Sequence, residues 1–271
     1  RNMFGTSDFW TKQTHHLDKM TMGQLVRAYF RYYAIQAYLA IAAVCILIAS
    51  FTVTAVVPNL LAIGSTLILF PLVWYILHRW VLHGTWLAKS PLTAATWKRV
   101  HYDHHMDPHN LQVLFGALHT TLPPIALITM PIGYGLDGIG GLCVAFATGC
   151  LMAAANEFVH CIQHLSIKPG NDALKTMKLR HMAHHFHDED GNYGITDFTW
   201  DRIFGTLYDR KDRPEKSPYV FNLGYDAAMA ARYPWVAELS GGVDERHPKH
   251  RRPPKGYDEL AADADAPAGQ D

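Results

Sequence analysis

The most constraining feature of this sequence is a long stretch without charge: residues 34–77 contain no Asp, Glu, Lys or Arg. One helix needs about 20 apolar residues to cross a bilayer, so this stretch is long enough for two. Pro58 and Asn59 form a turn-favouring pair near its middle, which predicts the reversal of a first helical hairpin. Helices in the core of a soluble protein rarely run this long without charge. The sequence therefore predicts a membrane protein.

A second pair of uncharged stretches, residues 110–136 and 138–156, lies on either side of Asp137 in a glycine-rich segment. They predict a second hairpin and four transmembrane helices in all. All 24 Lys and Arg residues lie outside the two hairpin tips. The positive-inside rule then places both termini and the loop between the two hairpins in the cytoplasm. We expect an integral, multi-pass membrane protein.

The expected fold class is all-α, with a cytoplasmic helical cap on the two hairpins. Lys+Arg and Asp+Glu are equal at 24 each, so no net charge attracts nucleic acid. The four cysteines show no CxxC spacing and are expected to be reduced packing residues. We divide the chain into an interfacial segment (1–33), a first transmembrane hairpin (34–77), a cytoplasmic segment (78–109), a second transmembrane hairpin (110–159), a cytoplasmic cap (160–240) and a disordered tail (241–271).

Histidine is unusually frequent, with 17 residues, and ten of these fall in four short clusters that we call boxes 1 to 4. On a helix, residues i, i+3 and i+4 share a face. Boxes 2, 3 and 4 fit that spacing, which predicts that each directs its imidazoles from one helical face toward one centre. The boxes are His78 and His83 in HRWVLH, His101, His104 and His105 in HYDHH, His160 and His164 in HCIQH, and His181, His184 and His185 in HMAHH.

Neutral imidazole is the commonest metal ligand in proteins and suits iron, zinc and copper. Five ligands for each of two ions would leave an open position, whereas a structural zinc ion takes four ligands. His78 and His83 are five residues apart, roughly 140° around a straight helix. Either the helix unwinds before Gly84, or the two histidines bind different metals. The other seven histidines are expected to lie outside the metal site.

The four boxes, in this order and interleaved with two hydrophobic hairpins, resemble the fatty acid hydroxylase / sterol desaturase superfamily of integral-membrane di-metal oxygenases. The segment HHFHDEDGNYGITDFTWDRIFGTLY, residues 184–208, is similar to the one that follows the last box in that family. Residues 105–124 look closer to the fatty-acyl 2-hydroxylase branch than to the sterol branch. The resemblance covers residues 73–208.

This resemblance implies a non-haem di-iron centre that activates O₂ and inserts one oxygen atom into a C–H bond of a lipid, expected to be a fatty acyl chain. It implies that the ten box histidines hold the two iron ions, and zinc could replace iron in the purified protein. The chain has no dinucleotide-binding GxGxxG pattern, haem CxxCH motif or iron–sulfur cysteine spacing. Electrons are therefore expected from an external donor of the ferredoxin or cytochrome b5 type, with its reductase.

Two other functions remain open at this point. A lipid or sterol desaturase on the same scaffold would remove two hydrogens from the same kind of bond, and the boxes do not separate the two reactions. A metal-binding or metal-transporting membrane protein is a different class. Transport predicts ionisable side chains along the spans, where the uncharged stretches carry only His119.

Several polar residues near the boxes are expected to support them. Asp103 either orients a box histidine or is a solvated loop carboxylate. Residues 188–190 are expected to form a solvated turn. Gly194 is expected to supply a positive φ, and Asp201 to cap or brace the segment around Trp200 and Phe204.

Overall fold

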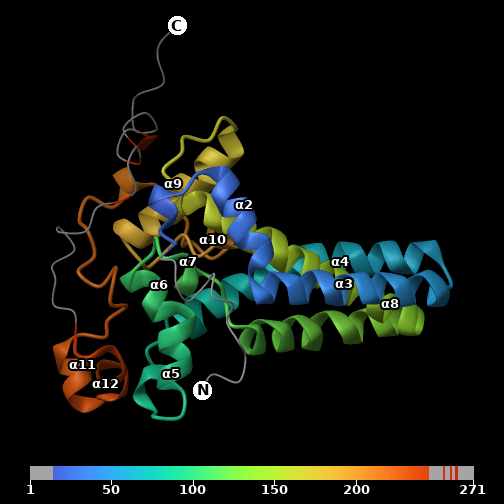
Figure 1. The fold of residues 1–271 in the computed structure, drawn as a ribbon, viewed down its shortest axis with the longest axis horizontal. Helices are drawn as coiled ribbons and strands as arrows, with labels where there is room; N and C mark the ends of the chain where they lie inside the picture. Colours follow the sequence, from blue (N-terminus) through green and yellow to red (C-terminus); the bar gives the residue numbers. More distant parts are fainter. Residues whose placement is uncertain (1–14, 244–252, 254–256, 258–259, 262–271) are drawn as a thin grey trace, which may run out of the picture.

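A bundle of long helices projects from a cap of short ones in the computed structural model, which describes residues 15–243, 253, 257, 260 and 261 (Figure 1). Throughout these residues the regular structure is helical, apart from an isolated bridge between His16 and Asn110. The all-α prediction is confirmed. The bundle consists of α3 (Tyr33–Thr52), α4 (Val56–Ile76) and α8 (Leu118–His164).

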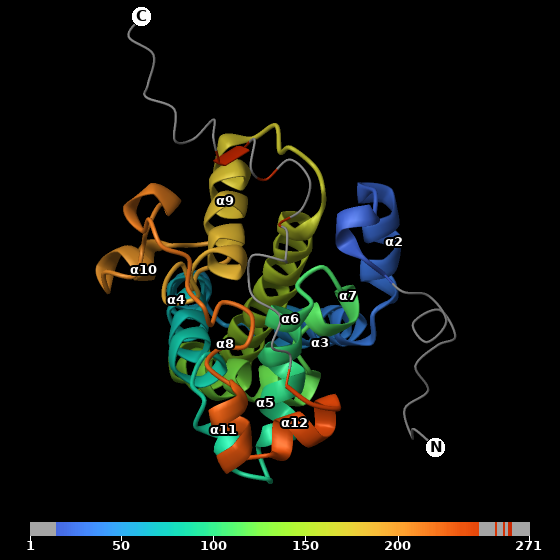
Figure 2. The same ribbon diagram turned by 90° about the vertical axis from the view of Figure 1, so that its left-hand side faces the viewer.

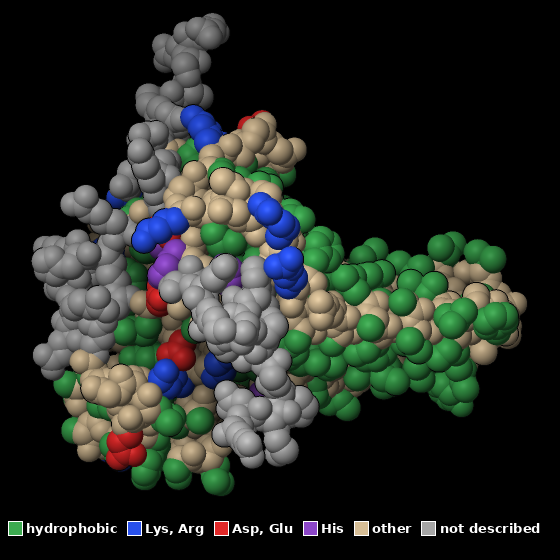
Figure 3. All heavy atoms as spheres, in the orientation of Figure 1, with side chains coloured by type: hydrophobic (Ala, Val, Ile, Leu, Met, Phe, Trp, Pro, Cys, Tyr) green, Lys and Arg blue, Asp and Glu red, His purple; other side chains and the backbone are tan. Residues whose placement is uncertain are grey.

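The bundle helices have the length and composition of membrane spans. Three segments are long and apolar enough to cross a membrane: Tyr33–Thr52, Val56–Lys89 and Leu111–His164. A 20-residue helix is about 30 Å long, close to the thickness of the hydrocarbon layer. In Figure 3 the projecting bundle is covered by hydrophobic side chains, whereas Lys and Arg gather on the cap. Membrane association follows from this division.

Helix α8 reverses direction in its middle. Asp137 (φ −149°, ψ 41°) and Gly138 (φ 54°, ψ −137°) leave the helical conformation. A Cβ atom on Gly133 would lie 2.2 Å from the carbonyl oxygen of Gly141, so the backbones of the two halves touch on either side of the break. The two halves of α8 therefore run antiparallel, and the predicted reversal at Asp137 is confirmed.

The predicted position of the first reversal is wrong by a few residues. The chain turns between Thr52 and Val56, and Pro58 is already the third residue of α4. Proline is tolerated in the first turn of a helix because its missing N–H would have no helical partner there. At this end of the bundle the backbone N–H of Thr54 donates to the Asp137 carboxylate at 2.9 Å. The two reversals are thus joined to each other.

Helix α2 (Met22–Arg31) lies against the base of the bundle (Figures 1 and 2). Thr21 and Gln24 form a capping box at its start. On its inner face the hydroxyl of Tyr29 donates to the Ala154 carbonyl of α8 at 2.5 Å. Phe30 is 53% exposed on the other side. The interfacial role of residues 1–33 stays a prediction.

Short helices make up the cap, and Figure 2 shows α9 on one side of the end of α8 with α11 and α12 on the other. All four cysteines are buried and free, as predicted. Most of the predicted tail lies outside the described residues, although Tyr257 and Ala261 are buried beside Phe186. The short elements are η1 (Leu17–Lys19), η2 (Leu77–Leu82), η3 (Leu87–Lys89), α5 (Ala94–Trp97), η4 (Lys98–Tyr102), α6 (Asp103–Met106), α7 (Leu111–Leu114), α9 (Asp172–Phe186), α10 (Thr199–Ile203), η5 (Arg210–Asp212), α11 (Ala227–Arg232) and α12 (Trp235–Ser240).

Candidate metal centre

Box 1 lies where α4 continues into the π-helix η2. The backbone N–H of His83 donates to the carbonyl oxygen of His78 at 3.0 Å. A π-helix pairs residues i and i+5, so the five-residue spacing brings both histidines to one face. Their ring centroids are 4.9 Å apart. Of the two possibilities for box 1, the local change in helix winding is the one observed.

The other boxes lie at element ends that meet beside box 1. Box 2 starts in a second π-helix, η4, and continues into α6. Box 3 forms the last turns of α8, and box 4 forms the last turns of α9. π-Helical turns often occur at functional sites, and two of the four boxes use one.

The ten box histidines form two groups of five, in which one nitrogen from each side chain lies within 4.8 Å of the others. All ten sequence-predicted residues are brought together, and nine of them are buried. The first group is His78, His83, His101, His105 and His184, and the second is His104, His160, His164, His181 and His185.

Boxes 2 and 4 are divided between the groups, which corrects the expectation that each box faces one centre. In box 2, His101 and His105 join the first group and His104 joins the second. Residues i and i+4 are about 40° apart around a helix, whereas residue i+3 lies about 60° to the other side. A box spaced i, i+3, i+4 therefore spans two adjacent ligand groups. Box 4 divides in the opposite sense, with only His184 in the first group.

Ring nitrogens face one another within each group. The Nε2 atoms of His78 and His101 are 3.2 Å apart, and those of His164 and His181 are 3.0 Å apart. His83 Nε2, His184 Nε2 and both nitrogens of His185 are buried without a hydrogen-bond partner. A neutral imidazole has one nitrogen with a free lone pair. Converging lone pairs without protein partners are the donor set that a metal ion requires, so these residues fit a metal pair.

The electrostatic environment keeps these imidazoles neutral. Burial, followed by the neighbouring imidazoles, lowers the pKa of His184 and His185 well below the usual histidine value. Burial also lowers the pKa of His105, to about 3. Metal binding requires the deprotonated ring. The groups contain no carboxylate, so an ion held here keeps its positive charge.

Backbone carbonyls orient three histidines of the first group. His78 Nδ1–H donates to the carbonyl of Tyr193 at 2.5 Å. His184 Nδ1–H donates to the carbonyl of Gly191 at 2.7 Å. His105 Nδ1 donates to the Val220 carbonyl at 2.8 Å. A proton on Nδ1 leaves Nε2 free as the ligand atom, and such outer contacts fix the ring orientation.

The loop that supplies two of these carbonyls is braced by Asp201. The buried Asp201 carboxylate accepts the backbone N–H groups of Tyr193 and Gly194, each at 2.8 Å. It also accepts the Thr206 hydroxyl at 2.8 Å. One carboxylate thus connects α10 to the carbonyl that orients His78.

The expectation of a positive φ at Gly194 is wrong. The residue with positive φ in this loop is Asn192, at 52°. Asn192 is buried and bonds to the backbone of Tyr208 through both ends of its amide. Gly194 is needed for a close approach, since a Cβ atom there would lie 2.0 Å from the Asp197 carbonyl oxygen.

The structure also differs from two expectations about acidic residues near the boxes. Asp103 pairs with Lys98 at 2.6 Å rather than with a histidine. Asp188 pairs with Arg213, and Glu189 is buried, so residues 188–190 do not form a simple solvated turn. The desolvated Glu189 carboxyl has its pKa raised to about 7.

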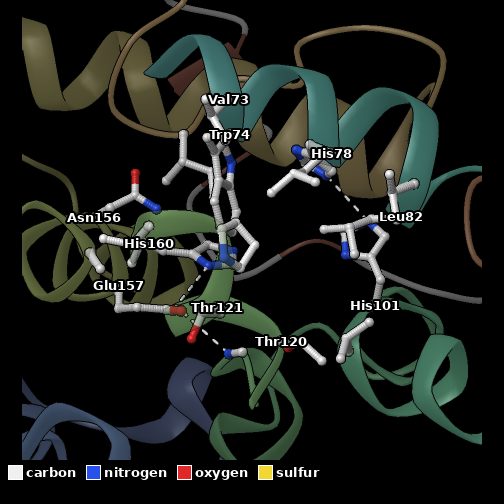
Figure 4. A pocket seen from close by; sticks show the side chains of 18 of the residues that line it. Val73, Trp74, His78, Leu82, His101, Thr120, Thr121, Asn156, Glu157 and His160 are labelled. Atoms are coloured by element: carbon white, nitrogen blue, oxygen red, sulfur yellow. Dashed lines mark hydrogen bonds and ion pairs between the residues drawn. The ribbon is translucent and has the colours of Figure 1, made fainter. Parts of the chain in front are cut away.

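An apolar pocket of about 180 Å³ opens beside the histidines and continues between α4 and both halves of α8 (Figure 4). Trp74 reaches from α4 into this pocket, with His78 and His101 to one side and Asn156 and Glu157 to the other. Sequence reasoning missed these lining residues. The available signal was their helical spacing from the boxes: Trp74 precedes His78 by four residues, and Glu157 precedes His160 by three.

The described histidines outside the boxes stay outside both groups. His187 contacts the Arg213 carbonyl through Nε2 at 2.6 Å. His109 lies next to the second group, its ring 5.8 Å from that of His164. His119 is exposed on α8.

A helical fold with a membrane-type bundle, two groups of five histidines and an adjoining apolar pocket defines a class: membrane-type proteins with two histidine groups that could each hold a metal ion. A match to a family model makes this class more specific. The model for fatty acid hydroxylase matches residues 63–206. This chain belongs to the fatty acid hydroxylase family, and the resemblance seen in the sequence is confirmed.

Curated relatives agree with the fatty-acyl 2-hydroxylase branch. The chain is 28% identical to the ceramide very long chain fatty acid hydroxylase of Saccharomyces cerevisiae, covering 50% of this chain and 35% of the relative. It is 26% identical to fatty acid 2-hydroxylase of Rattus norvegicus (62% and 46%). It is 30% identical to a dihydroceramide fatty acyl 2-hydroxylase of Arabidopsis thaliana (49% and 54%). The aligned parts thus span about half or less of these relatives, and no solved structure matches the chain.

Proposed function

We propose that this protein is a membrane-bound, O₂-dependent non-haem di-iron enzyme that hydroxylates a C–H bond of a lipid, in particular of a fatty acyl chain. The observation that carries the proposal is the junction of the two histidine groups with an apolar pocket inside the bundle. The family and the names of the relatives point to the same substrate class.

Each histidine group would hold one iron ion, and zinc could occupy the same positions in purified protein. When bound, the iron pair would supply the activation of O₂ that side chains cannot provide. One oxygen atom enters the C–H bond, and the other leaves as water after taking up two electrons and two protons. The chain's own residues have separate tasks in this reaction.

The histidines keep the ligand nitrogens deprotonated, and the carbonyls of Gly191, Tyr193 and Val220 hold three of the rings in place. The pocket accepts the acyl chain and excludes water, so that one carbon lies beside the centre. Apolar side chains of the bundle line it, among them Phe70 of α4 and Ile125 and Ala153 of α8. The acyl chain of a lipid in the bilayer reaches this pocket without passing through water.

We further propose four transmembrane segments, formed by α3, α4 and the two halves of α8, with the cap and both termini in the cytoplasm. The positive-inside rule supports this orientation, since the reversals at residues 53–55 and 137–138 carry no Lys or Arg. An external redox protein of the ferredoxin or cytochrome b5 type, with its reductase, would then deliver electrons on the cytoplasmic side.

The test is mass spectrometry of total lipids from a host that expresses this chain with a ferredoxin system. We expect a lipid species heavier by one oxygen atom, with that atom derived from labelled O₂. It should be absent with His184→Ala and present with His119→Ala, because His119 lies outside both groups. Loss of two hydrogens without added oxygen would instead identify a desaturase.

The metal-transport alternative receives little support from the bundle, where Glu157 is the one acidic residue among the described residues that line the pocket. His119, the ionisable residue that the sequence places in the uncharged stretches, is exposed on the outer surface of α8 and does not line the pocket. A transport path would need such groups along the interior of the spans.

A further inference from the structure

Trp74 occupies a position from which it can touch anything bound beside the first histidine group. It lies on α4 one helical turn before His78, and the two ring centroids are 6.1 Å apart. Figure 4 shows its indole extending into the pocket rather than along the wall. A ligand in the pocket therefore lies close to both this side chain and the histidines.

The indole Nε1–H of Trp74 is buried and has no hydrogen-bond partner. Buried donors are nearly always paired, because an unmade hydrogen bond leaves the cost of desolvation uncompensated. Two other indoles of this chain are paired: Trp86 donates to the Trp80 carbonyl at 2.9 Å, and Trp97 donates to that of Leu82 at 2.8 Å. The Nε1–H of Trp235, away from the pocket, is unpaired like that of Trp74. The missing partner of Trp74 is expected to come from the pocket.

Several other polar groups of the pocket wall are already engaged within the protein. The hydroxyls of Thr120 and Thr129 donate to carbonyls of their own helix, at 2.7 and 2.8 Å. Tyr38 and Thr121 bond to each other. Outside the histidines, Trp74 thus offers a buried, unpaired donor on a lining that is otherwise mostly apolar.

A fatty acyl group has the matching chemistry. Its tail is apolar, and its carbonyl oxygen only accepts hydrogen bonds. If the carbon next to the carbonyl is oxidised, that oxygen must be buried within a few bond lengths of the histidines, where an unpaired acceptor is costly. We propose that Trp74 Nε1–H donates to the carbonyl oxygen of the acyl substrate and so places the adjacent carbon at the histidine centre. This inference rests on the proposed function.

The test compares Trp74→Phe, which keeps an aromatic ring but removes the donor, with Trp235→Phe. Trp235 is the matched control, since it is also half-buried with an unpaired Nε1–H but lies in α12, away from the pocket. We expect Trp74→Phe to raise KM for the acyl substrate about tenfold. In the products of this variant, the hydroxyl group should be found not only on the carbon next to the carbonyl but also on carbons further along the acyl chain. Unchanged KM and position, with metal content equal to wild type, would overturn the proposal.

A second measurement needs no variant. Long-chain acyl amides and alkyl analogues of equal length without the carbonyl are compared as ligands of the detergent-solubilised wild type. The amide should bind about tenfold more tightly, and equal binding would overturn the role of Trp74. If the wild type binds amides preferentially but forms no hydroxylated lipid, the proposed function fails while the recognition by Trp74 stands.

Discussion

His101 and His104 lie about one helical turn apart, yet their Nε2 atoms face different partners: that of His101 is 3.2 Å from His78 Nε2, and that of His104 is 3.1 Å from His160 Nε2. A single box thus contributes to both groups. Any rotation of the short η4–α6 segment would move histidines of both groups together.

This division predicts separable effects on metal content. Alanine in place of His83 should remove mainly the ion of the first group, and alanine in place of His164 mainly that of the second. The metal content of the purified variants should fall from about two ions to about one per chain, since each group supplies one site of a pair. His119→Ala is the control and should keep both ions. Equal loss of both ions in every variant would contradict independent groups.

Replacing Asp201 by asparagine should loosen the first group without touching a ligand. The amide offers only one acceptor oxygen, so a buried backbone N–H of Tyr193 or Gly194 loses its partner. We expect a loss of about 1–3 kcal/mol in the free energy of unfolding and about 10–100-fold weaker metal binding. Chelator competition and thermal unfolding measure the two effects. The exposed Asp197→Asn serves as control, and identical behaviour of the two variants would refute the bracing role.

The two halves of α8 should be sensitive to a single methyl group. A Cβ atom on Gly141 would lie 2.1 Å from the carbonyl oxygen of Gly133, whereas one on Gly135 would meet nothing within 4 Å. Gly141→Ala should therefore destabilise the protein by about 1–3 kcal/mol, as overpacking does. Gly135→Ala should leave stability unchanged or slightly higher. Denaturant unfolding in detergent distinguishes them, and a neutral Gly141→Ala would argue against the close contact.

The raised pKa of the Glu189 carboxyl predicts that the stability of the protein depends on pH. Burial raises the pKa of its carboxyl from 4.5 to about 7 in the folded protein. Between these values the folded state holds a proton that the unfolded chain has released, so this contribution to stability is lost as the pH rises through about 7. Each unit of pKa difference corresponds to about 1.36 kcal/mol.

Glu189→Gln removes that titration. The thermal stability of the wild type should therefore fall relative to Glu189→Gln between mildly acidic and mildly alkaline pH, as measured by melting curves in detergent. Glu215→Gln changes an exposed carboxyl and should show no such trend. A constant difference between wild type and Glu189→Gln across the range would show that Glu189 is charged in the fold.

The sequence alone determined the class of fold and the set of candidate ligands. Uncharged stretches of spanning length leave few alternatives to membrane-type helices, and ten histidines at helical spacing are hard to explain without a common site. The expected reversal at Asp137 also followed from local sequence. These features depend on composition and short-range periodicity, which the chain carries along its length.

Only the tertiary structure decided how the box histidines are shared between the two groups and what surrounds them. The π-turn that aligns His78 with His83, the division of boxes 2 and 4, and the approach of Asp201 to the loop at Tyr193 depend on which helix ends meet. The unpaired indole of Trp74 in the pocket is a further case. Such relationships join residues far apart in the chain, so their geometry is fixed by packing between elements and not by spacing within one.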